Sequence, residues 1–285
     1  MADLNQYLNN VLRISAFSDE DKGGNPAGVL LSDEHPAAEA MQQIAAEVGF
    51  SETAFATPND GGYRVRYFSP ESEVPFCGHT TIALGAALAL KNGDGTFPLK
   101  LNEAEITVEG KRDGKIISAA LQSPPTFSRP ASSQLVTDAL NLFGFTEADL
   151  DLTIPIAFIN GGANHLVIAL NSRDRLATMK YDLEEGRRLM HREELITIIL
   201  VYQESPQLFH TRNPFASGGV YEDPATGAAS AAFAGYLRDI KWPHEGVINI
   251  VQGEDMGMRS IIKAEIPPEK GSSIRISGSA RMMNE

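Results

Sequence analysis

The side chains best suited to moving protons stand beside small, flexible residues. The segment "PFCGHTT" places Cys77, the single cysteine of the chain, two residues before His79. Glu52 lies in "GFSETAF", where apolar residues surround an acid, and Asp223 lies in "EDPATG". Carboxyl, imidazole and thiol groups are common general acids and bases. We therefore predict Glu52, His79 and Asp223 as catalytic residues, with Cys77 as their neighbour.

Two of these segments lead into helices of small residues. "CGHTTIALGAAL" (77–88) and "TGAASAAFAGYL" (226–237) align when Gly78 is placed on Gly227, which lies 149 positions later. Both are apolar on nearly every side, which is typical of a central helix covered by strands rather than of a surface helix. The repeat indicates two similar domains.

A weaker echo supports the duplication. "NPAGVLL" (25–31) and "NHLVIAL" (164–170) each carry a polar turn into an apolar strand, and they occur in the same order as the two helices. A chance likeness between alanine-rich helices is the alternative interpretation. Two echoes in one order favour duplication.

The starts of the two helices are candidate anion sites. A helix N-terminus presents free backbone N–H groups and a partial positive charge, and a glycine there lets a ligand approach the backbone. The alternative is that the glycines only make tight turns. The substrate-binding residues that we predict are Ser51, Cys77, Gly78, Thr226, Gly227 and Ala228.

Short strands dominate the rest of the pattern. Alternating and apolar runs predict strands at 10–17, 28–32, 63–68, 105–110, 115–122, 154–159, 164–170, 195–203, 208–212, 246–253, 259–266 and 273–277. Further helices are predicted at 36–48, with Met41, Ile44, Ala45 and Val48 on one face, at 132–143 and at 182–192.

These elements predict an α+β fold of two pseudo-symmetric domains. Each would be a curved, mostly antiparallel sheet wrapped around one central helix. The Pro- and Ser-rich stretch 122–133 suggests the boundary, so we predict domains at 1–124 and 125–285. The C-terminal strand is a candidate for packing back on the first domain.

Composition excludes several classes of function. The 285 residues carry a net charge of −13 and a pI near 4.9, which disfavours nucleic acid and anionic membranes as partners. We see neither a secretion signal nor an apolar run of membrane-spanning length, so we expect a cytoplasmic protein. One cysteine excludes an internal disulfide, and the six histidines show no metal-ligand spacing. We therefore expect no protein-bound metal, and no phosphate-binding loop is recognisable, although a lysine that anchors a cofactor stays open.

Six stretches together resemble the PhzF-like family, which has the diaminopimelate epimerase fold. They run in order from residue 24 to residue 260: "GNPAGVLL", "GFSETAFA", "RYFSPESEVPFCGHTTIALGAAL", "GGANHLVIAL", "RNPFASGGVYEDPATGAASAAFAGYL" and "VQGEDMGMRS". The resemblance implies two domains with an active site in the cleft between them, no cofactor and a homodimer. It also implies an isomerase that shifts a proton on a small carboxylate, as the family's dihydro-hydroxyanthranilate isomerase does. Glu52 would be the general acid/base, and His79 and Asp223 would hold and polarise the substrate.

Two positions depart from the phenazine isomerase of that family. Ala228 stands where that enzyme has a serine, and Cys77 stands where it has a small residue without a thiol. Cysteine-based epimerases and racemases of the same fold carry a thiol near this place, but their second thiol has no counterpart here. Two other hypotheses therefore stay open: an epimerase or racemase that uses Cys77 with Asp223 or Glu52, and a metabolite-binding protein without catalysis.

Overall fold

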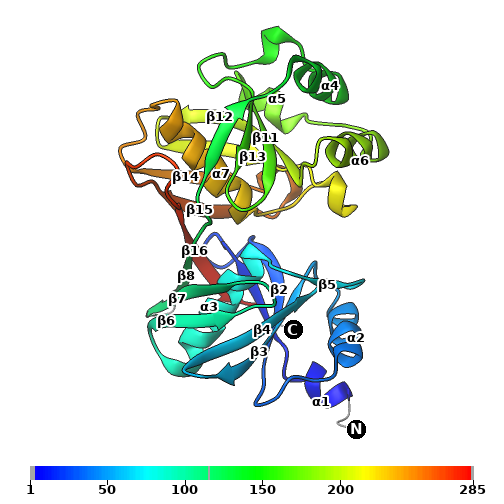
Figure 1. The fold of residues 1–285 in the computed structure, drawn as a ribbon, viewed down its shortest axis with the longest axis vertical. Coiled ribbons are helices and arrows are strands. Elements are labelled where there is room, and N and C mark those ends of the chain that lie inside the picture. Colours follow the sequence, from blue (N-terminus) through cyan, green and yellow to red (C-terminus); the bar gives the residue numbers. More distant parts are fainter. Residues whose placement is uncertain (1–3, 115, 284–285) are drawn as a thin grey trace. The chain divides into compact units, whose positions relative to one another are not determined.

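The computed structural model of the chain divides into two compact units (Figure 1). It describes residues 4–114 and 116–283. Unit 1 contains the chain up to Leu121 and again from Ser277, and unit 2 runs from Gln122 to Ile276. The predicted α+β architecture, with a curved sheet around a helix in each unit, is confirmed. The predicted domain boundary after residue 124 stays a prediction.

Unit 1 is a sheet that closes on itself. Its strands follow the order β1-β2-β3-β4-β6-β7-β8-β16, and β16 pairs with β1 to complete the ring. The parallel pairs are β2–β3 and β4–β6, and β5 extends β4. The bounds are β1 (Leu12–Ala16), β2 (Asn25–Leu31), β3 (Thr53–Asn59), β4 (Gly62–Phe68), β5 (Glu73–Val74), β6 (Gly95–Lys100), β7 (Glu105–Asp113), β8 (Ile116–Gln122) and β16 (Arg275–Met282).

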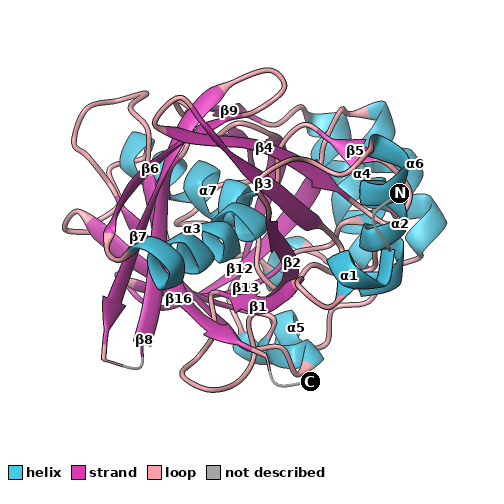
Figure 2. Cartoon of the chain, turned by 90° about the horizontal axis from the view of Figure 1, so that it is seen from below, coloured by secondary structure: helices cyan, strands magenta, loops and turns pink. Residues whose placement is uncertain are grey.

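Helix α3 (Gly78–Asn92) fills the interior of this ring (Figure 2). Every residue from His79 to Ala89 is buried, because strands cover the helix on nearly every side. Gly85 shows how close they come: a Cβ atom there would lie 2.6 Å from the Val108 Cγ2 atom of β7. Small residues are therefore a requirement of this packing rather than a sign of disorder.

The outer face of unit 1 carries α1 (Leu4–Leu8) and α2 (Ala38–Val48). Met41, Ile44, Ala45 and Val48 are the buried residues of α2, as the spacing predicts. They form one apolar cluster with Leu30, Phe55 and Phe68 of the underlying strands.

The curved sheet of unit 2 carries helices on both faces (Figure 1). Its strands follow the order β9-β10-β11-β12-β13-β14-β15. The bounds are β9 (Phe127–Pro130), β10 (Ala157–Asn160), β11 (Asn164–Leu170), β12 (Thr197–Ser205), β13 (Leu208–Arg212), β14 (Val247–Gln252) and β15 (Ser260–Glu265).

Helix α7 (Gly227–Asp239) packs on one face of this sheet, and every residue from Ala229 to Arg238 is buried. The rings of Phe209 and Phe233 meet edge to face there, with centroids 5.0 Å apart. The other face carries α4 (Ser133–Phe143), α5 (Arg173–Ala177) and α6 (Leu183–Arg192), which form one apolar cluster with the strands. Three short 3-10 turns complete the unit: η1 (Glu147–Asp149), η2 (Ala216–Gly218) and η3 (Glu254–Met256).

Besides the two-residue strand β5, three strands lie where no strand is predicted. β3 and β6 each contain a proline, and β9 lies inside the stretch 122–133 that we predict as a boundary loop. Pro58, Pro98 and Pro130 make these segments resemble turns in sequence. In the structure all three segments pair with a neighbouring strand.

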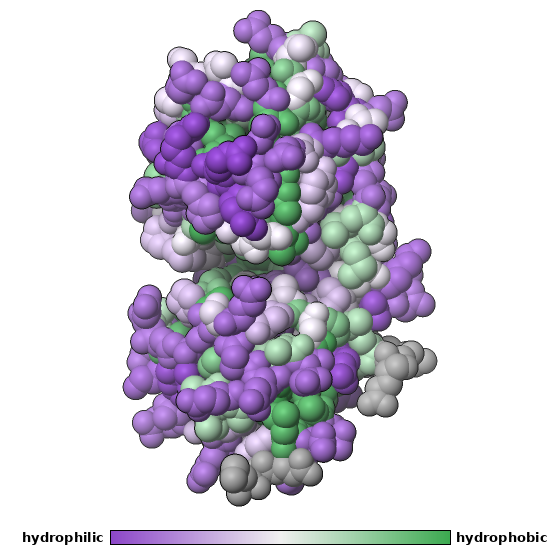
Figure 3. All heavy atoms as spheres, turned by 90° about the vertical axis from the view of Figure 1, so that its right-hand side faces the viewer, coloured by the Kyte–Doolittle hydropathy of each residue, from purple (hydrophilic) through white to green (hydrophobic). Residues whose placement is uncertain are grey.

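The surface of the molecule is mostly hydrophilic. In Figure 3 hydrophilic side chains cover most of the visible face of each unit, with small hydrophobic areas between them. No helix among the described residues combines the length and apolar character needed to cross a membrane.

His165 of β11 makes the interior of unit 2 sensitive to acid. The imidazole is 0% exposed, and its Nδ1 atom lies 2.7 Å from the Thr197 Oγ1 atom. Its Nε2 atom has no hydrogen-bond partner in the described part of the chain. Burial lowers the pKa of His165 to about 3, because a charged ring cannot be solvated there.

We predict that His165 makes the folded state less stable in acid. Between pH 6.5 and 3 the unfolded chain binds a proton at this residue that the folded chain does not. The free energy of unfolding should therefore fall with pH by up to about 1.4 kcal/mol per pH unit in this window. His165→Gln should remove this slope, as measured by urea unfolding at several pH values. His191→Gln, on the exposed face of α6, is the control and should leave the slope unchanged. An unchanged slope in His165→Gln would contradict the prediction.

Candidate active site

Glu52 stands directly before β3, where that strand pairs with β2. The Glu52 carbonyl oxygen accepts a hydrogen bond of 3.2 Å from the Gly28 N–H group of β2. Gly28 must be a glycine, since a Cβ atom there would lie 2.6 Å from the Thr53 Oγ1 atom. The Glu52 side chain keeps 17% of its surface exposed, and its Oε2 atom lies 3.5 Å from the Nε2 atom of His79. A carboxylate so placed is anchored through its backbone yet reachable by a ligand.

Cys77 and His79 meet at the start of α3. Cys77 has extended backbone angles and precedes the helix, and His79 lies in its first turn. The Cys77 Sγ atom lies 3.3 Å from the Nδ1 atom of His79. The other ring nitrogen, Nε2, lies 3.3 Å from both the Ser51 and the Thr80 hydroxyl oxygen. The imidazole therefore joins the thiol on one side to Glu52 and the hydroxyl groups on the other.

The direction of these hydrogen bonds assigns the tautomer of His79. The Thr80 hydroxyl donates to the Cys77 Sγ atom over 3.1 Å, and a hydroxyl has only one hydrogen to give. It can then only accept from His79, so the ring proton sits on Nε2 and Nδ1 accepts from the thiol. This places an N–H group beside the Glu52 carboxylate.

A metal ion is the alternative use of this cluster. Glu52, Cys77 and His79 each offer one ligand atom, and these atoms lie within 4.8 Å of one another. A metal ion would occupy only one ring nitrogen, whereas the observed contacts use Nδ1 for the thiol and Nε2 for the carboxylate. The geometry therefore favours a path for protons over a three-ligand metal site.

A buried tyrosine supports the start of α3. Thr81 donates its hydroxyl hydrogen to the Cys77 carbonyl oxygen over 2.7 Å, so the Tyr67 hydroxyl must donate to Thr81, at 2.8 Å. Burial raises the pKa of Tyr67, which keeps it a neutral donor. Our sequence analysis did not find this contact, because it joins a strand to a helix 14 residues later.

Asp223 and Thr226 form the matching segment at the start of α7 in unit 2. Thr226 has extended backbone angles and precedes the helix, which begins with Gly227 and Ala228. The Thr226 hydroxyl donates to the Oδ2 atom of Asp223. The Asp223 N–H group donates to the carbonyl oxygen of Asn213, at 3.1 Å. Asp223 and Ala228 are both partly exposed, so a ligand can reach this helix start.

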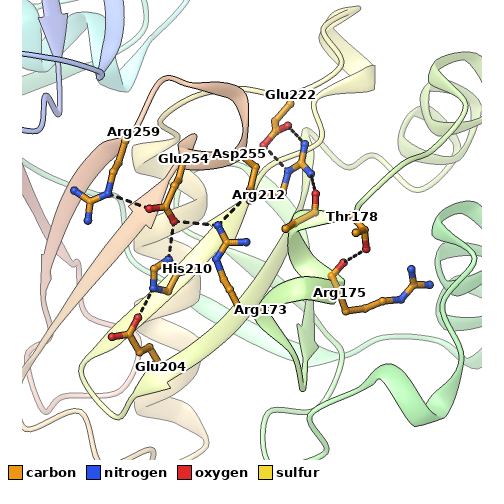
Figure 4. A network of polar contacts seen from close by, with 11 residues as sticks. Arg173, Arg175, Thr178, Glu204, His210, Arg212, Glu222, Glu254, Asp255 and Arg259 are labelled. Carbon is orange, nitrogen blue, oxygen red and sulfur yellow. Dashed lines mark hydrogen bonds and ion pairs between the residues drawn. The ribbon is translucent and has the colours of Figure 1, made fainter.

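A buried ion pair fixes the chain just before Asp223 (Figure 4). Glu222 accepts two hydrogen bonds from Arg212, at 3.0 and 2.5 Å, and is 5% exposed. Burial lowers the pKa of Arg212, but the hydrogen bonds and charge of Glu222 outweigh it and hold that pKa above its ordinary value.

Further charged residues hold the turn η3 (Figure 4). Arg173 donates to Glu254 at 3.0 Å and to Asp255 at 2.9 Å. His210 lies between Glu204 and Glu254, with distances of 2.6 and 3.2 Å. Hydrogen bonds from Arg173 keep the pKa of Glu254 below its ordinary value. The turn that follows β14 is therefore tied to β13 and α5.

The structure thus groups the predicted residues by unit. Ser51, Glu52, Cys77 and His79 meet in unit 1, with Gly78 beginning α3. Asp223, Thr226, Gly227 and Ala228 lie together at the start of α7 in unit 2. The catalytic and binding roles of all these residues stay predictions. Arg212, Thr80 and Tyr67 support the two groups and were not predicted, since no local motif marks them.

Comparison with known proteins shows to which family the chain belongs. Residues 14–285 match the family model PhzC-PhzF, described as phenazine biosynthesis-like protein. The trans-2,3-dihydro-3-hydroxyanthranilate isomerase of Pseudomonas aeruginosa is 32% identical over 290 residues, which cover 95% of this chain and 96% of that enzyme. An uncharacterized isomerase of Mesorhizobium japonicum is 31% identical, with 95% of each chain covered.

Solved structures show the same fold. A PhzF-family phenazine biosynthesis protein of Bacillus anthracis superposes with a TM-score of 0.84 at 22% identity, over 96% of both chains. A probable proline racemase of Agrobacterium radiobacter superposes with a TM-score of 0.65 at 11% identity, over 96% of this chain and 91% of that one. The chain belongs to the PhzC-PhzF family of phenazine biosynthesis-like proteins, and it is an isomerase of that family with the epimerase-like fold.

Proposed function

We propose that the chain moves a proton between two carbon atoms of a small carboxylate, with Glu52 as the general acid/base. The observation that carries this proposal is the contact between the Glu52 carboxylate and the Nε2 atom of His79, at 3.5 Å. The likeness to an enzyme named trans-2,3-dihydro-3-hydroxyanthranilate isomerase supports that compound as the first substrate to test.

The reaction needs one base and one hydrogen-bond donor. Glu52 removes a proton from a substrate carbon, so that its carboxylate gains an O–H bond and the electron pair stays in the conjugated substrate. The Nε2–H group of His79 stabilises the negative charge that develops. Glu52 then returns the proton to a second carbon, which balances the step without an external oxidant or reductant.

Binding is proposed for the two helix starts. Backbone N–H groups at Gly78, Gly227 and Ala228 are suited to a carboxylate, because the first N–H groups of a helix have no partner within it. Asp223 would repel a carboxylate and is suited instead to an ammonium or hydroxyl group of the substrate. The Ser51 hydroxyl lies beside His79. The Thr226 hydroxyl lies beside Asp223.

We predict that Glu52→Gln abolishes proton transfer. The amide keeps the size and polarity of the side chain but is not a base, so turnover should fall at least about 100-fold. The measurement is proton NMR of the enzyme with trans-2,3-dihydro-3-hydroxyanthranilate in D₂O, which follows conversion and deuterium uptake into the ring. If that compound is not converted, the same deuterium readout is applied to small amino and hydroxy acids.

Glu47→Gln is the matched control, since Glu47 is exposed on α2 and should leave the rate unchanged. Retained activity in Glu52→Gln would exclude Glu52 as the base.

A second candidate function is favoured by the contact of Cys77 with His79. A thiol 3.3 Å from an imidazole at a helix start can serve as a proton donor or acceptor in an epimerase or racemase. Asp223 or Glu52 would then be the second base. The main proposal assigns Cys77 only a supporting role through the Nδ1 atom of His79.

We predict that Cys77→Ser reduces the rate by less than 10-fold, because a serine hydroxyl can still donate to the Nδ1 atom of His79. The same NMR assay measures this rate, and circular dichroism checks the fold. A loss as large as that of Glu52→Gln would favour the cysteine-based reaction instead.

We also propose that the chain forms a homodimer, which the family resemblance supports. β9 ends the strand order of unit 2, so one of its edges has no neighbouring strand among the described residues. Light scattering of the purified protein at several concentrations should give the mass of two chains. A single-chain mass throughout would contradict the dimer.

A further inference from the structure

Gln252, the last residue of β14, makes three hydrogen bonds to the segment that carries Asp223. Its Oε1 atom accepts from the Thr226 N–H group at 3.1 Å. Its Nε2 atom donates to the Asp223 carbonyl oxygen at 2.7 Å and to the Thr226 hydroxyl oxygen at 3.0 Å. The side chain is 0% exposed, so none of these bonds competes with solvent.

The residue after Gln252 shows how closely this segment lies on the end of β14. Gly253 has a φ of +72°, and a Cβ atom there would lie 2.7 Å from the Pro224 carbonyl oxygen. It would also lie 2.5 Å from the Met258 carbonyl oxygen. Only glycine fits at this point, and the following turn η3 is held by Arg173. The strand end is therefore a fixed support.

The three bonds fix the direction of the side-chain amide. Its oxygen must face the Thr226 N–H group and its NH₂ group the Asp223 carbonyl oxygen, so a flipped amide would lose both bonds to the backbone. The Thr226 hydroxyl accepts from Gln252, and its single hydrogen is then directed to the Oδ2 atom of Asp223. A chain of donors thus runs from Gln252 through Thr226 to Asp223, and it suits Asp223 as a charged acceptor.

We infer that Gln252 is a positioning residue, which acts through the Thr226 hydroxyl to keep the Asp223 carboxylate oriented for substrate binding. This inference rests on the proposed role of Asp223. Gln252 does not touch the reacting atoms in this scheme. Its contribution is to direct the hydrogen bond from the Thr226 hydroxyl to the Asp223 carboxylate.

Gln252→Glu reverses that direction. An ionised glutamate at this position offers only acceptors, so the Thr226 hydroxyl turns its hydrogen toward residue 252 and its hydrogen bond to Asp223 is lost. kcat/KM at neutral pH should fall about 10- to 100-fold, the range for losing a hydrogen bond to a charged group. The acidic limb of the pH–rate profile should move to higher pH, because a carboxylate that accepts one hydrogen bond fewer takes up a proton more readily.

Thr226→Val tests the same path with a smaller disturbance. It keeps the backbone N–H group and the branched shape but removes the hydroxyl, so it should reproduce the shift of the acidic limb. Thr226→Ser should restore the original profile. The double variant Gln252→Glu/Thr226→Val should lose no more activity than Gln252→Glu alone, since both changes cut one path.

The controls separate positioning from general stability. Gln207→Glu alters a glutamine of unit 2 that makes one hydrogen bond, to the Pro243 carbonyl oxygen, and should leave the pH profile unchanged. Urea unfolding checks that each variant is folded. The inference would be overturned if the activity losses of Gln252→Glu and Thr226→Val were additive in the double variant and the pH–rate profile of Thr226→Val were not shifted.

The variant Asp223→Asn distinguishes a failure of the positioning inference from a failure of the proposed function. If it leaves kcat/KM unchanged, Asp223 has no role in binding, and the inference falls with that role. If Asp223→Asn impairs the enzyme but Thr226→Val and Gln252→Glu do not shift its profile, the positioning inference alone is wrong.

Discussion

Each unit depends on the burial of one helix that is apolar on nearly every side. In α3 every residue from His79 to Ala89 is buried, and in α7 every residue from Ala229 to Arg238 is buried. Where a strand comes closest to such a helix, only a small residue fits, as Gly85 shows beside Val108. At the start of each of these helices, the first backbone N–H groups have no partner within the helix. The packing requirement therefore determines where a ligand can be bound.

The two helix starts use the same backbone feature with different side chains. In unit 1 the imidazole of His79 connects a thiol to a carboxylate. In unit 2 hydroxyl and amide groups surround Asp223, and they favour a fixed negative charge. The two units therefore present one helix start with three titratable side chains in contact and one with a hydrogen-bonded carboxylate.

The local sequence pattern predicts only part of this arrangement. The buried face of α2 and the starts of α3 and α7 follow from the spacing of apolar and small residues. It missed β3 and β6, because their prolines resemble turn signals and only pairing with neighbouring strands makes them extended. It also missed Gln252 and Arg212, whose partners lie 26 and 10 residues away in the chain. Contacts of this kind exist only once the sheet has formed.

The pairing of β16 with β1 has a consequence for the order of folding. Ile14 faces Met282 across this pair, so the ring of unit 1 closes with a strand that is synthesised after all of unit 2. On the ribosome, unit 2 can complete its strand pairing while the first unit still presents the open edge of β1. Closing that edge requires a contact between distant parts of the chain, which is slow to form. The newly made protein must therefore keep an incomplete barrel from aggregating until its final strand arrives.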